Sequence, residues 1–191
     1  TFTVTPKTGL TAGTYNETIT VATTQSTTAE VSVKFKVNGQ LDVGISPEEP
    51  TIINGDSVTL TAYPSGGSGS YTYKWHAGSD TAVLSTDKIC TVSPDTTTIY
   101  TVVINDGIEG KETTARVRVN PKNYTITASP TIKDFGSKNP GYGAIATQTI
   151  TVTNTGNSEV TLQQPTSTNY TIGDLSATTL APEATATFTV T

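Results

Sequence analysis

Residues 54–77 read "NGDSVTLTAYPSGGSGSYTYKWHA". Apolar and polar residues alternate in "SVTLTAY" and again in "YTYKWHA", and the run "SGGSGS" separates the two segments. Alternation at period two is the pattern of a β-strand that buries one face, whereas a helix repeats its apolar residues every three or four positions. The stretch therefore predicts two strands, with Gly66, Gly67 and Gly69 in a flexible hairpin tip between them.

The same alternation recurs along the whole chain. More than one residue in five is Thr, which is β-branched and favours strands, and no window shows an apolar stripe at helical spacing. Gly, Pro, Asn, Asp or Ser bounds each alternating segment. The sequence therefore predicts an all-β protein of antiparallel sandwiches from these segments: "TFTVT", "NETITVATT", "AEVSVKFKV", "SVTLTAYPS", "YTYKWHA", "KICTVSP", "IYTVVIND", "TARVRVNP", "YTITASP", "TQTITVTNT", "VTLQQ" and "ATFTVT".

Composition argues against two classes of partner. Only 14% of residues are charged and the net charge is -5, so the chain lacks the gathered Lys and Arg that bind phosphate, and we expect no nucleic-acid partner. No segment approaches the roughly 18 consecutive apolar residues of a membrane span. No charged-then-apolar start resembles a signal peptide. We therefore expect no membrane insertion by this sequence.

Two turn-rich points, "VNGQLDV" near residue 39 and "NPKNY" near residue 122, divide the strands into three blocks: 1–39, 40–121 and 122–191. The middle block has about 80 residues and enough strands for a self-sufficient immunoglobulin-like sandwich. The two outer blocks are each too small, because a lone piece of three strands that exposes an apolar face is marginal in water.

The pentapeptide "TFTVT" occurs twice, at residues 1–5 and at 187–191. Joined through this shared strand, the outer blocks make roughly 105 residues, which is the size of one sandwich. The chain then corresponds to one period of a tandem array. We expect residues 1–39 to complete residues 122–191, either within one chain or head to tail between neighbours, as in donor-strand complementation, and head-to-tail pairing would give a filament.

The middle block resembles the PKD-type (polycystic kidney disease) and related Ig-like repeats of bacterial surface proteins. The resemblance rests on "NGDSVTLTA", on "SGGSGSYTYKW" with Trp75, and on "TTTIYTVVINDG" followed by a final alternating strand. It implies an immunoglobulin-like antiparallel β-sandwich over residues 40–121.

The joined outer blocks resemble the abnormal-spindle-like (ASH) group of Ig-like sandwiches, as found in tandem in surface proteins of Gram-positive bacteria. The matching features are Phe135-Gly136, "TVTNTGN" at 151–157, "LAPEATATFTV" at 180–190 and "PKTGLTAGTY" at 6–15. The resemblance implies that residues 122–191 are the N-terminal part of such a domain, and residues 1–39 its C-terminal part.

The inventory of reactive side chains is small. The chain has one histidine, His76, and one cysteine, Cys90, so a zinc site or a Ser-His-Asp arrangement lacks ligands or partners and no disulfide can form within the chain. We expect no catalytic residues, no metal site and no cofactor, and Cys90 to be a small buried residue of a strand. Several carboxylates lie beside turn residues, where their side chains can bond to nearby backbone. The alternative is that they bind calcium. They are "PEEP" at 47–50, Asp80, Asp87, Asp95, Asp106 and Glu109.

Tyr71, Tyr73 and Trp75 alternate along one strand and so share a face. One interpretation packs them in the core, as the single Trp of Ig-like domains is packed. The other makes an exposed aromatic strip for sugar rings, with Tyr73, Trp75 and His76 as the ligand-binding residues.

Two functions follow. The first is a non-catalytic, extracellular spacer repeat of a bacterial cell-surface protein, whose partners are neighbouring repeats of the same protein. The second is an adhesin or carbohydrate-binding accessory module, whose partner is a glycan or another host-surface ligand. The exposure of Trp75 discriminates between them.

Overall fold

The computed structural model describes residues 1–191, and all its regular structure is β-strand. The prediction of an all-β protein of immunoglobulin-like antiparallel sandwiches is confirmed. No helix capable of crossing a membrane is found. The chain forms two compact units, Thr1–Val119 and Asn120–Thr191. The strands are β1 (Gly13–Ala22), β2 (Thr28–Val37), β3 (Gly39–Ser46), β4 (Thr51–Ile53), β5 (Val58–Gly67), β6 (Thr72–Ala77), β7 (Ile89–Val92), β8 (Thr98–Asn105), β9 (Gly110–Asn120), β10 (Ile126–Ser129), β11 (Gln148–Asn154), β12 (Val160–Thr161), β13 (Thr179–Leu180) and β14 (Thr185–Val190).

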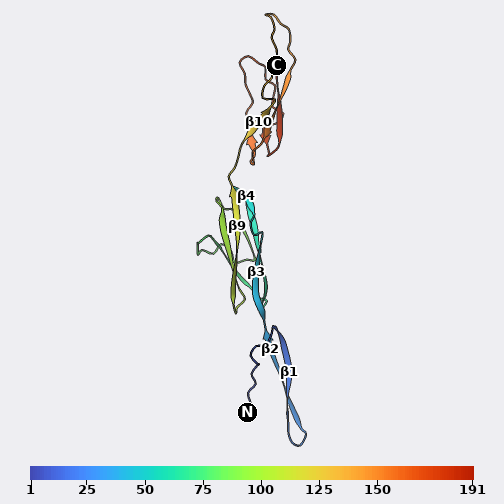
Figure 1. Ribbon diagram of the computed structural model, residues 1–191, viewed down its shortest axis with the longest axis vertical. Helices are drawn as coiled ribbons and strands as arrows, with labels where there is room; N and C mark the ends of the chain where they lie inside the picture. Colours follow the sequence, from blue (N-terminus) through green and yellow to red (C-terminus); the bar gives the residue numbers. More distant parts are fainter. The chain divides into compact units, whose positions relative to one another are not determined.

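Strands β1 and β2 form an antiparallel hairpin and pair with no other strand (Figure 1). Side chains alternate across a strand, so the register assigns each residue to a face. One face is polar, with Thr, Asn, Ser, Glu and Lys at nearly all its positions. The opposite face is apolar apart from Glu17, and consists of Gly13, Tyr15, Glu17, Ile19 and Val21 of β1 with Ala29, Val31, Val33, Phe35 and Val37 of β2.

The middle sandwich has two sheets, one with strand order β3-β5-β7 and the other with order β4-β9-β8-β6. Four strand pairs in them are antiparallel: β3–β5, β5–β7, β6–β8 and β8–β9. Strand β4 lies beside β9, and just before β4 the Pro50 carbonyl oxygen accepts a hydrogen bond from Arg118 N–H at 2.8 Å. Inward-facing side chains from both sheets fill one core, as the alternation predicted. Its members are Ile45, Ile52, Leu60, Ala62, Trp75, Cys90, Val92, Tyr100, Val102, Ile104, Ala115 and Val117.

The run "SGGSGS" does not form a hairpin tip, and that prediction is wrong. It connects β5 of one sheet to β6 of the other, and the two strands do not pair. Gly66 has φ of 72°, and a Cβ there would overlap the carbonyl oxygen of Gln40 on β3. The glycine is required because the connection passes directly against β3 in a backbone conformation that other residues rarely adopt.

The chain enters and leaves the middle sandwich at opposite ends. Near the start of β3, the Leu41 N–H donates to Glu109 Oε1 at 2.7 Å, beside the loop that follows β8. Near the end of β9, the Val119 N–H donates to Thr97 Oγ1 at 3.1 Å, just before β8 begins. The eight residues of β8 therefore separate the two points by about 26 Å.

The C-terminal unit contains a sheet of order β10-β11-β14 and a small second sheet of β12 and β13. A further segment covers the free edge of β14, since Gly173 N–H donates to Thr189 O and Ser176 N–H to Thr187 O. The second copy of "TFTVT" thus lies in β14 with partners on both sides. The first copy, at residues 1–5, lies in no strand.

Alternation in the three-stranded sheet is nearly perfect. The register places Thr or Ser at every position of one face. The inner face carries Ile126, Ala128, Ile150, Val152, Asn154, Ala186, Phe188 and Val190, with Gln148 at its end. The buried cluster on this side is small, however: Val160, Leu180 and Ala186, with Leu162, Leu175, Ala177 and Ala184 packed against it.

Candidate functional site

Trp75 lies at the centre of the middle sandwich. Its exposed fraction is 0%, and its indole Nε1–H donates to the Asp87 carbonyl oxygen at 2.8 Å. The Trp75 backbone also forms hydrogen bonds with the segment beside β6: its N–H donates to the Ser85 carbonyl oxygen, and its carbonyl oxygen accepts from the Leu84 N–H. A ring enclosed in this way has no face available to a sugar.

The other two predicted ligand-binding residues lie on either side of β6. Tyr73 faces the same way as Trp75 and is half-buried against the core. His76 is the next residue after Trp75 and points to the opposite face, where its Nδ1 lies 3.1 Å from the Ala82 carbonyl oxygen. The structure therefore brings Tyr73 and Trp75 together in the core and separates His76 from both.

Asp106 is the most engaged of the predicted turn carboxylates. It is buried and accepts hydrogen bonds from the backbone N–H groups of Glu109 (2.8 Å), Ile108 (2.9 Å) and Ser68 (2.6 Å). These bonds, the one from Glu109 foremost, hold the pKa of the Asp106 carboxyl below its ordinary value. Asp106 thereby fixes the β8–β9 turn and the β5–β6 connection to each other.

The segment "NDG", residues 105–107, forms the turn that follows β8. Asn105 Oδ1 accepts the Gly107 N–H at 2.7 Å, and Gly107 has φ of 89°. No group of three or more His, Cys, Asp or Glu side chains is arranged to hold a metal ion. Cys90 is buried and free, and desolvation raises the pKa of its thiol.

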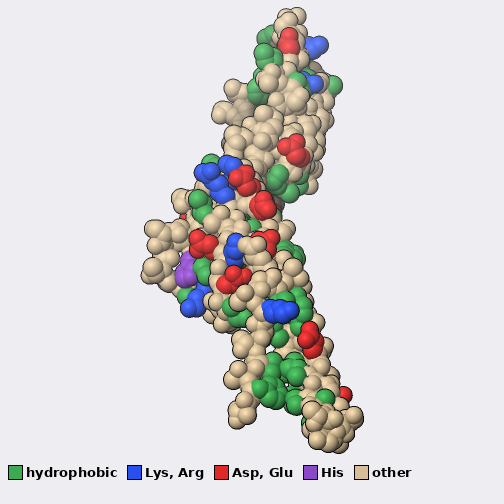
Figure 2. Space-filling model, turned by 60° about the horizontal axis from the view of Figure 1, so that its bottom comes forward, with side chains coloured by type: hydrophobic (Ala, Val, Ile, Leu, Met, Phe, Trp, Pro, Cys, Tyr) green, Lys and Arg blue, Asp and Glu red, His purple; other side chains and the backbone are tan.

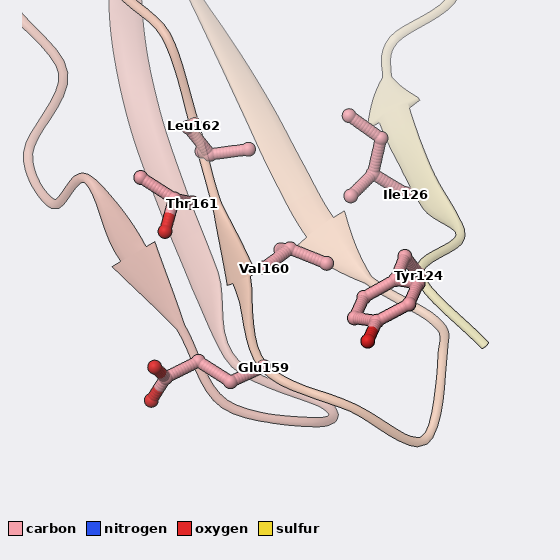
Figure 3. Close-up of a pocket in the computed structure, with 6 residues that line it drawn as sticks. All are labelled: Tyr124, Ile126, Glu159, Val160, Thr161 and Leu162. Atoms are coloured by element: carbon pink, nitrogen blue, oxygen red, sulfur yellow. The ribbon is translucent and has the colours of Figure 1, made fainter. Parts of the chain in front are cut away.

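A shallow cavity of about 440 Å³ opens in the C-terminal unit between its two sheets (Figure 3). Ile126 of β10 and Tyr124 line one side, and Val160 and Leu162 on the β12 segment line the other. Figure 3 shows the side chains of Val160 and Leu162 directed toward the side where Ile126 and Tyr124 lie, while Glu159 points away. The lining of the cavity is both apolar and polar, since Glu159 and Thr161 lie beside Val160 and Leu162, and it holds no cluster of reactive groups.

Around this cavity, two structural features lack a partner. β12 pairs with β13 along one edge only, and its other edge carries no strand. The inner face of the main sheet is incompletely covered as well, because Ile150, Phe188 and Val190 remain half-buried. Sequence reasoning placed no functional residue here, although the alternation of β11 and β14 was itself the signal for an inner face that needs covering.

Hairpin β1–β2 has an apolar face that no other sheet covers. On its apolar face, the exposed fraction is 48% for Val31 and 42% for Phe35, and Val21 is similarly exposed. Figure 2 shows hydrophobic side chains gathered over the hairpin. The structure therefore contains two unpartnered apolar surfaces: the hairpin face and the open face of the C-terminal unit, defined by Tyr124, Ile126, Ile150, Val160, Leu162 and Phe188.

The chain was compared with protein families, curated proteins and solved structures. No protein-family model matches the chain, and no curated protein sequence matches it. Among solved structures, it is similar to the N-terminal eight Ig domains of Down Syndrome Cell Adhesion Molecule, isoform 1.30.30, at 14% identity and a TM-score of 0.44. That similarity covers 94% of this chain and 26% of the other, so this chain spans about a quarter of that structure's length.

Proposed function

We propose that this chain is a non-catalytic structural module, a spacer repeat in the extracellular part of a bacterial cell-surface protein that projects or links other domains. The observation that carries the proposal is the path of the chain through the middle sandwich, which it enters at Gly39 and leaves at Asn120, at opposite ends of a closed core. A domain threaded in this way adds its full length to an array. The resemblance to tandem PKD-type and ASH-like repeats supports the same role.

The surfaces also suit a spacer. The outer face of the β10-β11-β14 sheet carries only Thr and Ser, and only 14% of all residues are charged. Trp75 is fully enclosed in the core of the middle sandwich. Neighbouring repeats of the same protein are the partners that this role requires.

Force spectroscopy on the full chain, held at its two ends, tests the proposal. We expect the middle sandwich to unfold in one discrete step that releases roughly 25 nm of chain, because about 80 residues become extended. Leu60→Ala should lower the force of that step without changing its length, whereas Thr59→Ala on the outer face should leave both unchanged. Gradual extension with no discrete step would show that the sandwich does not bear load.

Carbohydrate binding is the second candidate function. Only Tyr73 and His76 of the three predicted residues retain some exposure, and they lie on opposite faces of β6. A glycan array probed with the full chain is the direct test. Binding that Tyr73→Ala or His76→Ala abolishes would favour the adhesive module over the spacer.

A further inference from the structure

We propose that the hairpin β1–β2 of a second copy of this chain docks on the open face of the C-terminal unit, pairs with β12 and completes the sandwich. The proposal goes beyond the spacer function and does not depend on a cell-surface role. It rests on a strand-by-strand comparison of the two sandwiches, on the faces of the hairpin, and on the path of the chain.

The C-terminal unit repeats part of the middle sandwich. The sheet of order β10-β11-β14 corresponds to the sheet of order β3-β5-β7. In each sheet, the strand that comes first in sequence lies at one edge, the next strand of that sheet lies in the centre, and the last lies at the other edge. The strand that follows the central one in sequence crosses to the second sheet in both cases: β6 in the middle sandwich and β12 in the C-terminal unit.

The part that the C-terminal unit lacks is a hairpin. In the middle sandwich, hairpin β8–β9 pairs with β6 through β8 and covers the inner face of the opposite sheet with Val102, Ile104, Ala115 and Val117. No strand takes the place of β8 beside β12. The free edge of β12, the cavity and the half-buried Ile150 and Phe188 all mark this missing position.

Hairpin β1–β2 has the form of the missing piece. Its strands have ten residues each, close to the eight and eleven of β8 and β9. Both hairpins are antiparallel, and both present one apolar face. That face is buried in β8–β9 and unpartnered in β1–β2, so docking would bury the exposed Val31 and Phe35 against Ile150 and Phe188.

The order of segments along the chain agrees. In the middle sandwich, five residues separate the end of β7 at Val92 from the start of β8 at Thr98. The last four residues of β14, the counterpart of β7, belong to the pentapeptide "TFTVT" at 187–191, and the other copy, at 1–5, is separated from β1 by residues 6–12. The hairpin therefore follows this pentapeptide by about the spacing that separates β7 from β8.

Short connections restrict docking of this kind within one chain. Asn38 alone joins β2 to β3, and the five residues 121–125 that precede β10 span about 17 Å when extended. The two ends of the middle sandwich from which these connections leave are about 26 Å apart. Closure within one chain would require the hairpin to reverse at a single residue, and a second copy avoids this.

Docking of this kind is heterologous, because each copy carries one hairpin and one open face. Copies would join head to tail into open chains rather than closed pairs. Light scattering on the full chain over a concentration series should show a mass that rises steadily above 19.9 kDa. Two variants separate the two surfaces: Val31→Asp places a charge on the apolar face of the hairpin, and Ile126→Asp places one in the cavity.

Each variant alone should remain monomeric, because every junction needs both surfaces. An equimolar mixture should give a heterodimer and nothing larger, since one intact hairpin meets one intact open face. Ser32→Asp on the polar face of the hairpin and Thr127→Asp on the outer face of β10 are matched controls that should assemble as the parent does. Both Val31 and Ile126 are about half exposed in the single chain, so their substitution leaves each unit folded.

Hydrogen exchange provides the second measurement. The amides of β1 and of the β12 segment should gain protection on assembly. The Gly156 amide donates to Asn154 Oδ1 at 2.9 Å. Its protection should persist in every variant and shows that the C-terminal unit is folded. Fluorescence of Trp75 reports the same for the middle sandwich. A parent chain that stays monomeric at all concentrations would overturn the proposal, whether or not its hairpin amides are protected. A mixture that forms no heterodimer would overturn it as well.

Discussion

The middle sandwich and the C-terminal unit share a strand plan and differ in closure. Each holds a buried polar side chain where a strand ends: Asp106 after β8 and Asn154 at the end of β11. The core of the middle sandwich is a cluster of twelve buried residues, whereas that of the C-terminal unit has three, Val160, Leu180 and Ala186. The same alternating pattern therefore gives a closed core in the middle sandwich, where hairpin β8–β9 covers the inner face of the opposite sheet, and a partly open face in the C-terminal unit, which has no such hairpin.

The greatest loss of stability is expected from truncating an inward-facing side chain on the central strand of each main sheet. Leu60 lies on β5, the central strand of its sheet, and is fully buried, whereas Ile150 lies on β11, the central strand of its own sheet, and is half-buried. Leu60→Ala should lower the free energy of unfolding of the middle sandwich by about 2–5 kcal/mol, because it leaves a cavity in a closed core. Ile150→Ala should lower that of the C-terminal unit by only about 1 kcal/mol. Denaturant titration, followed by Trp75 fluorescence for the first and by amide exchange for the second, measures both; equal losses would contradict the comparison.

A smaller effect concerns the buried polar groups. Asn154 donates through Nδ2 to the carbonyl oxygens of Ser158 and Leu180, both at 2.9 Å. Asn154→Asp keeps the shape but removes both donors, and should cost the C-terminal unit about 1–3 kcal/mol because two carbonyls lose their partners. Asn154→Ala should cost about as much. If Asn154→Asp left the exchange rates of this unit unchanged, the two bonds would not contribute to its stability.

The stability of the middle sandwich should depend on pH through Asp106. Because the folded-state pKa of Asp106 is lowered, its stabilisation is complete above the pKa of the unfolded chain, about 3.9, and is lost as pH falls through the folded value. The free energy of unfolding of the middle sandwich should therefore be flat near neutral pH and fall in acid. Asp106→Asn should lower it at pH 7 and weaken the acid dependence, as measured by urea titration from pH 7 to pH 2. The same acid dependence in the variant would assign it to other carboxylates.

The smallest effect is expected at the surface. Arg118 and Glu49 form an ion pair of 3.0 Å with both side chains largely exposed, and the hydrogen bond from Arg118 lowers the pKa of Glu49. Exposed pairs contribute little because water and salt screen them. Glu49→Gln should leave the unfolding midpoint of the middle sandwich within the error of the measurement, and 1 M salt should not alter this result. A clear loss would mean that the pair anchors β9 to the segment before β4.

Sequence patterns predicted the fold class because alternation reports directly which face of a strand is buried. They did not predict strand partners: "SGGSGS" suggested a hairpin between β5 and β6, yet these strands belong to different sheets. Alternation alone also left Trp75 open to two interpretations, since an inward face and an exposed strip have the same period. The sequence placed Asp106 in a turn, but not in the interior, because its burial depends on the approach of Ser68 from another loop.

The apolar face of hairpin β1–β2 also has a consequence for synthesis. The hairpin precedes the C-terminal unit in the chain, and a ribosome adding about 5–20 residues per second needs roughly 8–30 s to make the residues from β2 to the end of β14. During that interval, the open face of the same chain does not yet exist, and the hairpin is exposed to other nascent chains. Glu17, at the middle of the apolar face, places a charge where two hairpins would otherwise stack. Such a charge acts as a gatekeeper against aggregation, so we expect Glu17→Val to lower the yield of native protein during translation.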